Sequence, residues 1–120
     1  MIEGGTVQRL TVGFVAVALA SGVSPGFSQD AKKIDRGKQV YAEQKCKLCH
    51  SVAGEGNVKG ALDGVGGKLI RDEIKEWIVN PQEMTTKTKA TRKPPMKAYP
   101  KLSAEDLEAI VSYMESLKAK

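Results

Sequence analysis

The chain has few of the side chains from which small proteins usually build sites and cores. Its 120 residues include one histidine, two cysteines, one tryptophan, three tyrosines and two phenylalanines. A single histidine excludes any site that needs two imidazoles from one chain, and two cysteines allow at most one internal disulfide. No apolar run reaches the about 20 residues that a membrane-spanning helix needs. The sparse aromatic content predicts a small apolar core.

The N-terminal segment has the pattern of an export signal. A short start with one basic residue precedes the apolar and small residues of Leu10–Val23, and a turn-like SPGFSQD follows. We therefore expect residues 1–28 to be an export signal, cleaved after Ser28 or after Gly22, and residues 29–120 to be one exported, periplasmic domain. A core helix or a membrane anchor is the alternative, but the run is short for an anchor, so no stable membrane insertion is expected.

Three segments of the domain carry apolar side chains at helical spacing: residues 34–47, 71–79 and 103–117. Ser103 and Asp106 form a capping pair at the start of the last one, and Pro81 closes the second. Six glycines within 51–67 predict a loop, and residues 80–102 show no periodicity. No segment has a strand pattern. The sequence predicts an all-α fold of three main helices joined by two long loops.

Both cysteines and the histidine lie in one five-residue stretch, CKLCH, from Cys46 to His50. The spacing C-x-x-C-H is the attachment sequence for c-type haem. Cys46 and Cys49 project the same way from a helical turn, so each can form a thioether with one haem vinyl group. His50 then comes to lie beneath the iron as an axial ligand. One covalent haem c would also supply the apolar core that the chain lacks.

Other uses of the motif fit the sequence less well. A structural zinc site needs four protein ligands, and the motif offers three with no further cysteine or histidine in the chain. A redox-active dithiol is expected beside a βαβ unit, of which there is no sign. A disulfide across two intervening residues closes too small a loop to stabilise the fold much. The export signal further favours haem.

The ligand on the other face of the iron is a methionine, another group or nothing, because His50 is the only histidine. Met1 lies in the predicted signal and Met114 in the apolar stripe of the last helix, which leaves Met84 and Met96. Prolines in KPPMKAYP stiffen the backbone around Met96 and favour it. An open sixth site would instead suit a gas-binding sensor or a peroxidase-like enzyme, although no distal acid–base pair is evident.

The domain resembles a bacterial class I cytochrome c, a small monohaem electron carrier. The resemblance rests on these residues: Gly37 and Tyr41, Ile110, Tyr113 and Met114, LDGVGGKL (62–69), EWIVNP (76–81) and PPMKAYPKLSAEDLEAIVSYM (94–114). It implies helices and long loops wrapped around one covalent haem, with the first and last helices crossing at Gly37. It also implies Met96 as the distal ligand.

One departure from the family concerns the proximal loop. The family usually has a proline near Gly60 or Ala61, whose carbonyl accepts a hydrogen bond from the proximal imidazole, and KGALDG has none. A backbone acceptor is still expected, since a ligating histidine nearly always donates its second N–H. The sequence does not say which carbonyl it is.

The resemblance implies a soluble one-electron carrier between respiratory or photosynthetic redox partners rather than an enzyme. Trp77 is either a haem propionate contact or a buried helix residue. Residues 87–101 of the second loop hold six bases and no acid, which form either a docking site for an acidic partner or a solvated loop: Lys87, Lys89, Arg92, Lys93, Lys97 and Lys101. We expect a monomer that does not bind nucleic acid.

Overall fold

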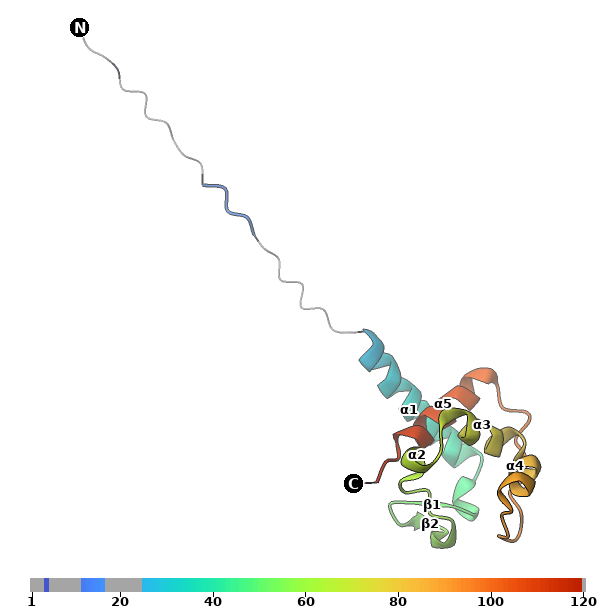
Figure 1. Cartoon of the computed structure of the whole chain (residues 1–120). Coiled ribbons are helices and arrows are strands. Elements are labelled where there is room, and N and C mark those ends of the chain that lie inside the picture. The colour runs from blue at the N-terminus through green and yellow to red at the C-terminus, as the bar shows by residue number, and fades with distance from the viewer. Residues whose placement is uncertain (1–3, 5–11, 17–24, 120) are drawn as a thin grey trace.

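The computed structural model describes Gly4, residues 12–16 and residues 25–119, with side chains in the last range from Asp30 onward. Most of the predicted export signal, with the alternative cleavage site after Gly22, lies outside the described residues, and the side chain of Ser28 is not described. The cleavage therefore stays a prediction. Within the described part, no helix is both long and apolar enough to cross a membrane. Residues 25–119 fold into the helical unit in Figure 1.

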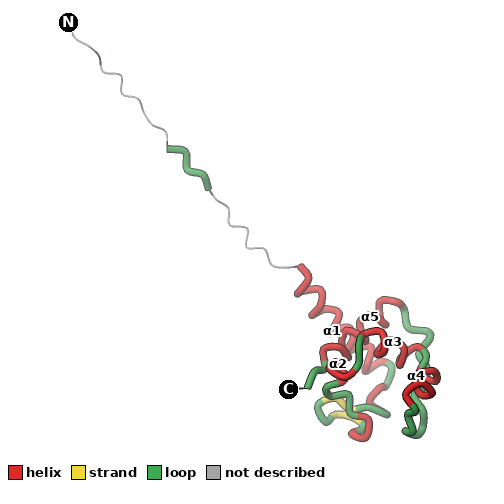
Figure 2. The backbone as a smooth tube through the Cα atoms, in the orientation of Figure 1, coloured by secondary structure: helices red, strands yellow, loops and turns green. Residues whose placement is uncertain are grey.

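Helices dominate this unit, and the all-α fold class is confirmed. Five α-helices lie within the described residues: α1 (Pro25–Glu43), α2 (Val65–Lys68), α3 (Arg71–Val79), α4 (Pro81–Thr88) and α5 (Ala104–Ser116). Short 3-10 turns cover Cys46–Leu48 and Val58–Gly60. Two-residue strands, β1 (Ser51–Val52) and β2 (Glu55–Gly56), pair antiparallel with Ser51 opposite Gly56. Figure 2 shows this small hairpin at the end of the unit away from the start of α1.

The crossing of α1 and α5 forms the centre of the fold. A Cβ placed on Gly37 would lie 2.2 Å from the carbonyl oxygen of Ala109, so only glycine allows this approach of the two backbones. Val40 and Val111 are both fully buried, at 0% exposure. The expectation that the first and last helices cross at Gly37 is confirmed.

Ion pairs reinforce the helix contacts at their edges. Arg36 on α1 donates from Nε and Nη2 to the two carboxylate oxygens of Asp106 on α5, at 2.8 and 2.9 Å. Arg71 on α3 bonds to Glu108 and to Glu115 on α5, the latter at 2.7 Å. These groups are partly exposed, so each pair adds little to stability, but bidentate geometry fixes the register of the helices.

The start of α5 follows its sequence signal. The Ser103 side chain accepts a hydrogen bond from the backbone N–H of Asp106, at 3.1 Å. This satisfies one of the free amides in the first turn of the helix. The buried side chains of α5 are Ala109, Ile110, Val111, Tyr113 and Met114. The predicted cap is confirmed, and Met114 belongs to the core.

Two predicted boundaries of the first helix are wrong. We expected a helix from Ile34 to Lys47, but α1 runs from Pro25 to Glu43. Its early turns are exposed at 31–33, so apolar periodicity cannot reveal them. Its end comes before Lys45, whose φ of 56° places it in the left-handed region.

The two loops are also more structured than predicted. Residues 81–88 form α4 where we expected irregular chain, because Pro81 suits the first helical position and Met84 is buried at 5% exposure. The glycine-rich loop contains the hairpin of β1 and β2 and the single-turn helix α2. Elements this short leave no detectable period in the sequence.

Candidate functional site

The CKLCH stretch forms a tight turn directly after α1. The carbonyl of Cys46 accepts hydrogen bonds from the N–H groups of Cys49, at 3.1 Å, and His50, at 2.9 Å. Both thiols are free; that of Cys46 is partly buried and Cys49 is exposed. Burial raises the pKa of the Cys46 thiol to about 11. The motif thus brings two unpaired thiols and the imidazole together on one turn.

His50 is held by the proximal loop. Its Nδ1 lies 2.9 Å from the carbonyl oxygen of Gly60, so Nδ1–H donates this bond. The imidazole is partly buried, and burial lowers the pKa of His50, an effect that the bond to Gly60 opposes. A neutral ring that donates from Nδ1 leaves the Nε2 lone pair for a metal. Gly60, at the place where the family usually has proline, is therefore the backbone acceptor that the sequence left open.

The backbone at the end of the β1–β2 hairpin, at Gly56 and Asn57, contacts the CKLCH motif. The N–H of Asn57 lies 2.9 Å from the carbonyl of His50 and 3.1 Å from that of Lys47. A Cβ on Gly56 would lie 2.2 Å from the His50 carbonyl, and its φ of 110° also requires glycine. The glycine content of this loop lets its backbone wrap closely around the motif.

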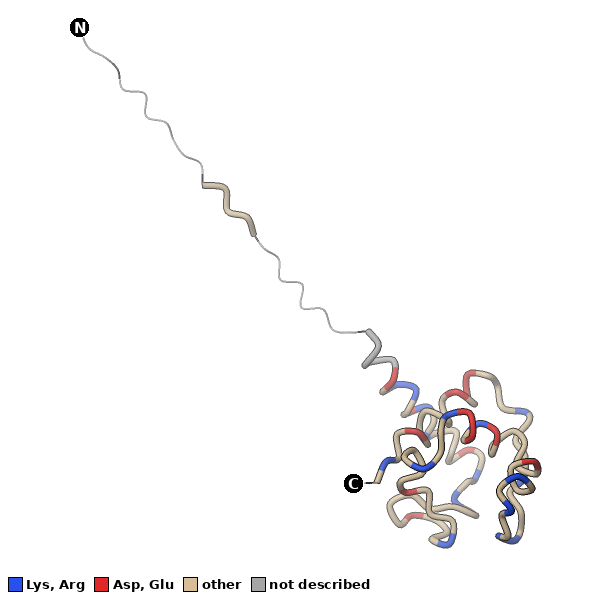
Figure 3. The backbone as a smooth tube through the Cα atoms, viewed as in Figure 1, with Lys and Arg blue, Asp and Glu red and all other residues tan. Residues whose placement is uncertain are grey.

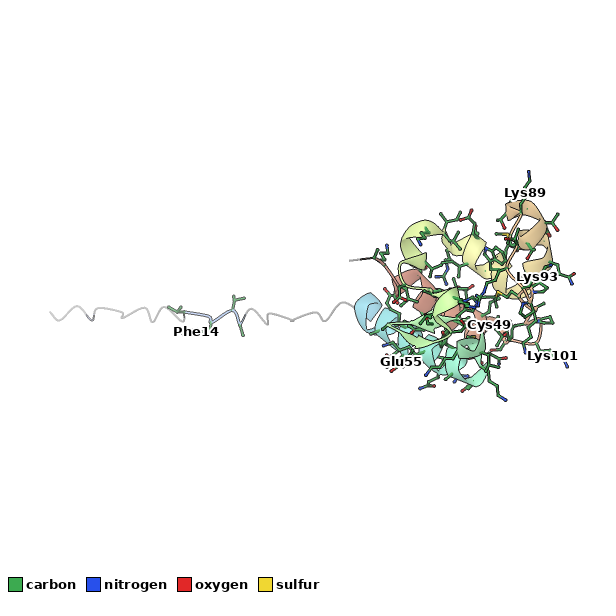
Figure 4. All side chains as sticks on the ribbon, turned by 90° about the horizontal axis from the view of Figure 1, so that it is seen from below. Phe14, Cys49, Glu55, Lys89, Lys93 and Lys101 are labelled. Carbon is green, nitrogen blue, oxygen red and sulfur yellow. The ribbon has the colours of Figure 1, made fainter. Side chains whose placement is uncertain are left out.

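Arg92 reaches the motif from the segment that follows α4. Its Nη2 donates to the carbonyl oxygen of Cys49 at 2.6 Å. Figure 4 shows Cys49 beside the segment that carries Lys93 and Lys101. The sequence placed Arg92 only among the bases of a charged loop and missed this contact. The missing proline near Gly60 was the one sign that the proximal loop is built differently.

Residues 89–102 bring Met96 to the same region. Met96, Tyr99 and Leu102 are partly buried and pack against the core, as does Cys46. The backbone N–H of Tyr99 donates to the carbonyl of Ile78, at 2.9 Å, and anchors the segment. Burial, with smaller electrostatic contributions from Cys46 and Cys49, raises the pKa of Tyr99.

The other predicted candidates lie elsewhere. Met84 is buried within α4, so its sulfur is part of the interior. Trp77 is partly buried on α3, and its contact with a haem propionate stays a prediction.

These residues fit a covalently attached haem. The donor set comprises two free thiols on one turn, an imidazole with Nε2 available and a methionine on an adjacent segment. The hydroxyl of Tyr41 is buried without a hydrogen-bond partner among the described residues, and burial, with the nearby Cys46, raises its pKa to about 12. An orphaned buried hydroxyl next to the attachment cysteine is expected where a bound group completes the pocket.

Comparison with known proteins supports the same assignment. A cytochrome c oxidase subunit 2 from Alkalihalophilus pseudofirmus is 34% identical over 93 residues, which cover 70% of this chain and 25% of that protein. The chain therefore spans about a quarter of this relative. No solved structure gives a significant match.

Residues 34–118 match the cytochrome c family over most of the helical unit. Proteins of this family carry covalently attached haem c, and Cys46, Cys49 and His50 stand in the corresponding C-x-x-C-H arrangement. The family is one of haem-based electron-transfer proteins. The chain belongs to the cytochrome c family.

Proposed function

We propose that this cytochrome c is an exported one-electron carrier in which His50 and Met96 are the axial ligands of the haem iron. The observation that carries the proposal is the bond from His50 Nδ1–H to Gly60, because it leaves Nε2 available for the iron. Haem c, when bound, takes up and releases one electron at its iron. The residues around His50 and Met96 hold these two side chains in place and limit their contact with water.

His50 acts through its fixed orientation. The bond to the Gly60 carbonyl fixes the tautomer and the orientation of the ring. It also makes the Nε2 lone pair a stronger electron-pair donor to a metal. Partial burial and the hairpin around Asn57 limit the motion of the imidazole. Little therefore has to rearrange around the metal when its charge changes, which keeps electron transfer fast.

Met96 would be the second residue to hold the haem iron. Its side chain is partly buried against the core, and the Tyr99–Ile78 backbone bond anchors the segment three residues further on. A thioether ligand raises the reduction potential. If His50 and Met96 both held the iron, no position would remain there for a substrate, which supports electron transfer rather than catalysis.

The segment around Met96 also offers a surface for redox partners. Its six bases are all exposed: Lys87, Lys89, Arg92, Lys93, Lys97 and Lys101. Figure 3 shows Lys and Arg positions recurring along α4 and the chain that follows it. Such a surface steers an acidic partner, with an association rate that falls as salt increases. The relative is named as a cytochrome c oxidase subunit, which supports an oxidase as one such partner.

Matched methionine variants test the ligation. We expect oxidised holoprotein to show the weak near-infrared sulfur-to-iron band, Met96→Leu to lose it and Met84→Leu to keep it. Both changes preserve volume, so both variants should fold. A band that survives in Met96→Leu and disappears in Met84→Leu would overturn the assignment. So would a wild-type protein that has no band and binds carbon monoxide at once when reduced.

A further inference from the structure

Arg92 differs from the lysines around it in what it touches. Its guanidinium binds the carbonyl of Cys49, the residue that precedes the proximal histidine. The contact joins residues 43 positions apart in the sequence, so it ties the segment after α4 directly to the haem-attachment turn. A charge-assisted bond of this kind restrains the backbone more strongly than a neutral one.

Gly60 makes room for this guanidinium. A Cβ on Gly60 would lie 2.0 Å from Nη1 of Arg92 and 2.1 Å from the carbonyl oxygen of Cys49. Any side chain at this position would therefore displace Arg92 or the turn. The carbonyl of the same Gly60 accepts the bond from His50. Arg92, Cys49, Gly60 and His50 thus form one connected set on the side of the imidazole.

We propose that Arg92 is a positioning residue for the proximal imidazole, clamping the Cys49 carbonyl and the Gly60 peptide in place of the proline that this chain lacks. The proposal rests on His50 being the proximal ligand, as proposed above. Its second consequence is electrostatic: a fixed positive charge beside the imidazole disfavours the oxidised haem iron, which carries the higher charge.

The electrostatic consequence follows from where the guanidinium lies. Its Nη2 is 2.6 Å from the carbonyl oxygen of Cys49, the residue next to His50. Gly60, whose carbonyl accepts the His50 bond, leaves the room that its Nη1 occupies. An arginine also keeps its charge and its planar pair of donors at any pH that the fold survives.

The test uses the holoprotein with Arg92→Gln and, as matched control, Lys93→Gln, which removes one exposed charge from the neighbouring position. Arg92→Gln should shift the equilibrium toward the oxidised form on the order of tenfold, and the shift should persist at high salt. Lys93→Gln should give a smaller shift that high salt abolishes. The ring-proton NMR shifts of His50 should change in Arg92→Gln and stay unchanged in Lys93→Gln.

A substitution at Gly60 and a conservative one at Arg92 complete the set of variants. Gly60→Ala should shift the equilibrium in the same direction as Arg92→Gln but less, because it displaces the guanidinium without removing its charge. The double variant should shift by less than the sum of the two, because both changes break the same contact. Arg92→Lys should retain part of the effect of Arg92 on the reduction potential, because the positive charge remains. It should still alter the His50 resonances, since lysine lacks the planar pair of donors. Additive effects of Gly60→Ala and Arg92→Gln, or equal salt-sensitive shifts for Arg92→Gln and Lys93→Gln, would overturn the clamp. If the wild type keeps its near-infrared band, the proposed ligation stands in either case.

Discussion

The crossing of α1 and α5 and the segment of residues 89–102 differ in how far the chain itself buries their side chains. At the crossing of α1 and α5, Gly37, Val40 and Val111 are buried and the two backbones nearly touch. In residues 89–102 no side chain is buried, and only Met96, Tyr99 and Leu102 are partly so. One region packs protein against protein, whereas the other is mostly exposed and contributes only these three partly buried side chains to the core.

The attachment turn shares the character of the second region. Leu48, inside the motif, is 73% exposed, and Cys49 is exposed as well. In a domain of this size the apolar surface that the chain buries by itself is limited. The comparison implies that the helix crossing forms the apolar core that the chain builds by itself, and that covalent haem adds apolar surface at the attachment turn.

Removal of the haem should have the largest effect on this comparison. Cys46→Ala combined with Cys49→Ala abolishes both attachment points, and we expect a loss of about 5 kcal/mol or more, most of the free energy of unfolding of a small domain. Intact-mass analysis checks attachment, and urea unfolding followed by circular dichroism measures stability. An unfolding midpoint equal to that of wild type would show that the helix crossing suffices alone.

Gly37→Val should have the next largest effect, because it attacks the crossing directly. The new side chain would meet the Ala109 carbonyl, so we expect a loss of about 3 kcal/mol or more by overpacking. Gly67→Ala is the matched control: a Cβ there meets nothing within 4 Å, and the change should stay within about 0.5 kcal/mol of wild type. Equal urea midpoints for the two variants would contradict the assigned role of Gly37.

The sequence was most informative where the signal is local. The bounds of α3, Arg71–Val79, agree with the prediction because apolar spacing marks its body and Pro81 its end. The cap at Ser103 follows from a four-residue pattern. The role of Gly37 could be predicted because two helix backbones that cross this closely leave no room for a Cβ atom.

The rest was hidden for physical reasons. Helix α4 has one buried apolar side chain, Met84, besides its first residue Pro81, so no period could reveal it. The contact of Arg92 with Cys49 depends on chain packing across the whole fold and leaves no local pattern. The family resemblance pointed to Met96, while composition and elimination alone left Met84 as an alternative.

Ser103→Ala should have a smaller effect, again on the helix side of the comparison. The change removes the acceptor for the Asp106 N–H, and we expect a loss of about 1 kcal/mol from α5. Ser103→Thr keeps a capping hydroxyl and should recover most of that loss. Urea unfolding of the three holoproteins makes the measurement; if Ala and Thr behave alike, the cap contributes nothing at this site.

Acid should cause a small loss of stability at the helix crossing, at a pH that leaves the segment of residues 89–102 unaffected. The bonds from Arg36 lower the pKa of Asp106 in the folded state. The stabilisation is therefore complete above the unfolded-state pKa of an aspartate and is lost as pH falls through the lower, folded-state pKa. Both groups are solvent-accessible, so the effect is small and declines further with salt. Asp106→Asn should flatten the fall in urea midpoint between about pH 5 and about pH 2. Amide protection factors at the crossing, corrected for the intrinsic exchange rate at each pH, should fall with the same pH dependence. Equal acid slopes for wild type and Asp106→Asn would show that the α1–α5 contact is held by its apolar residues alone.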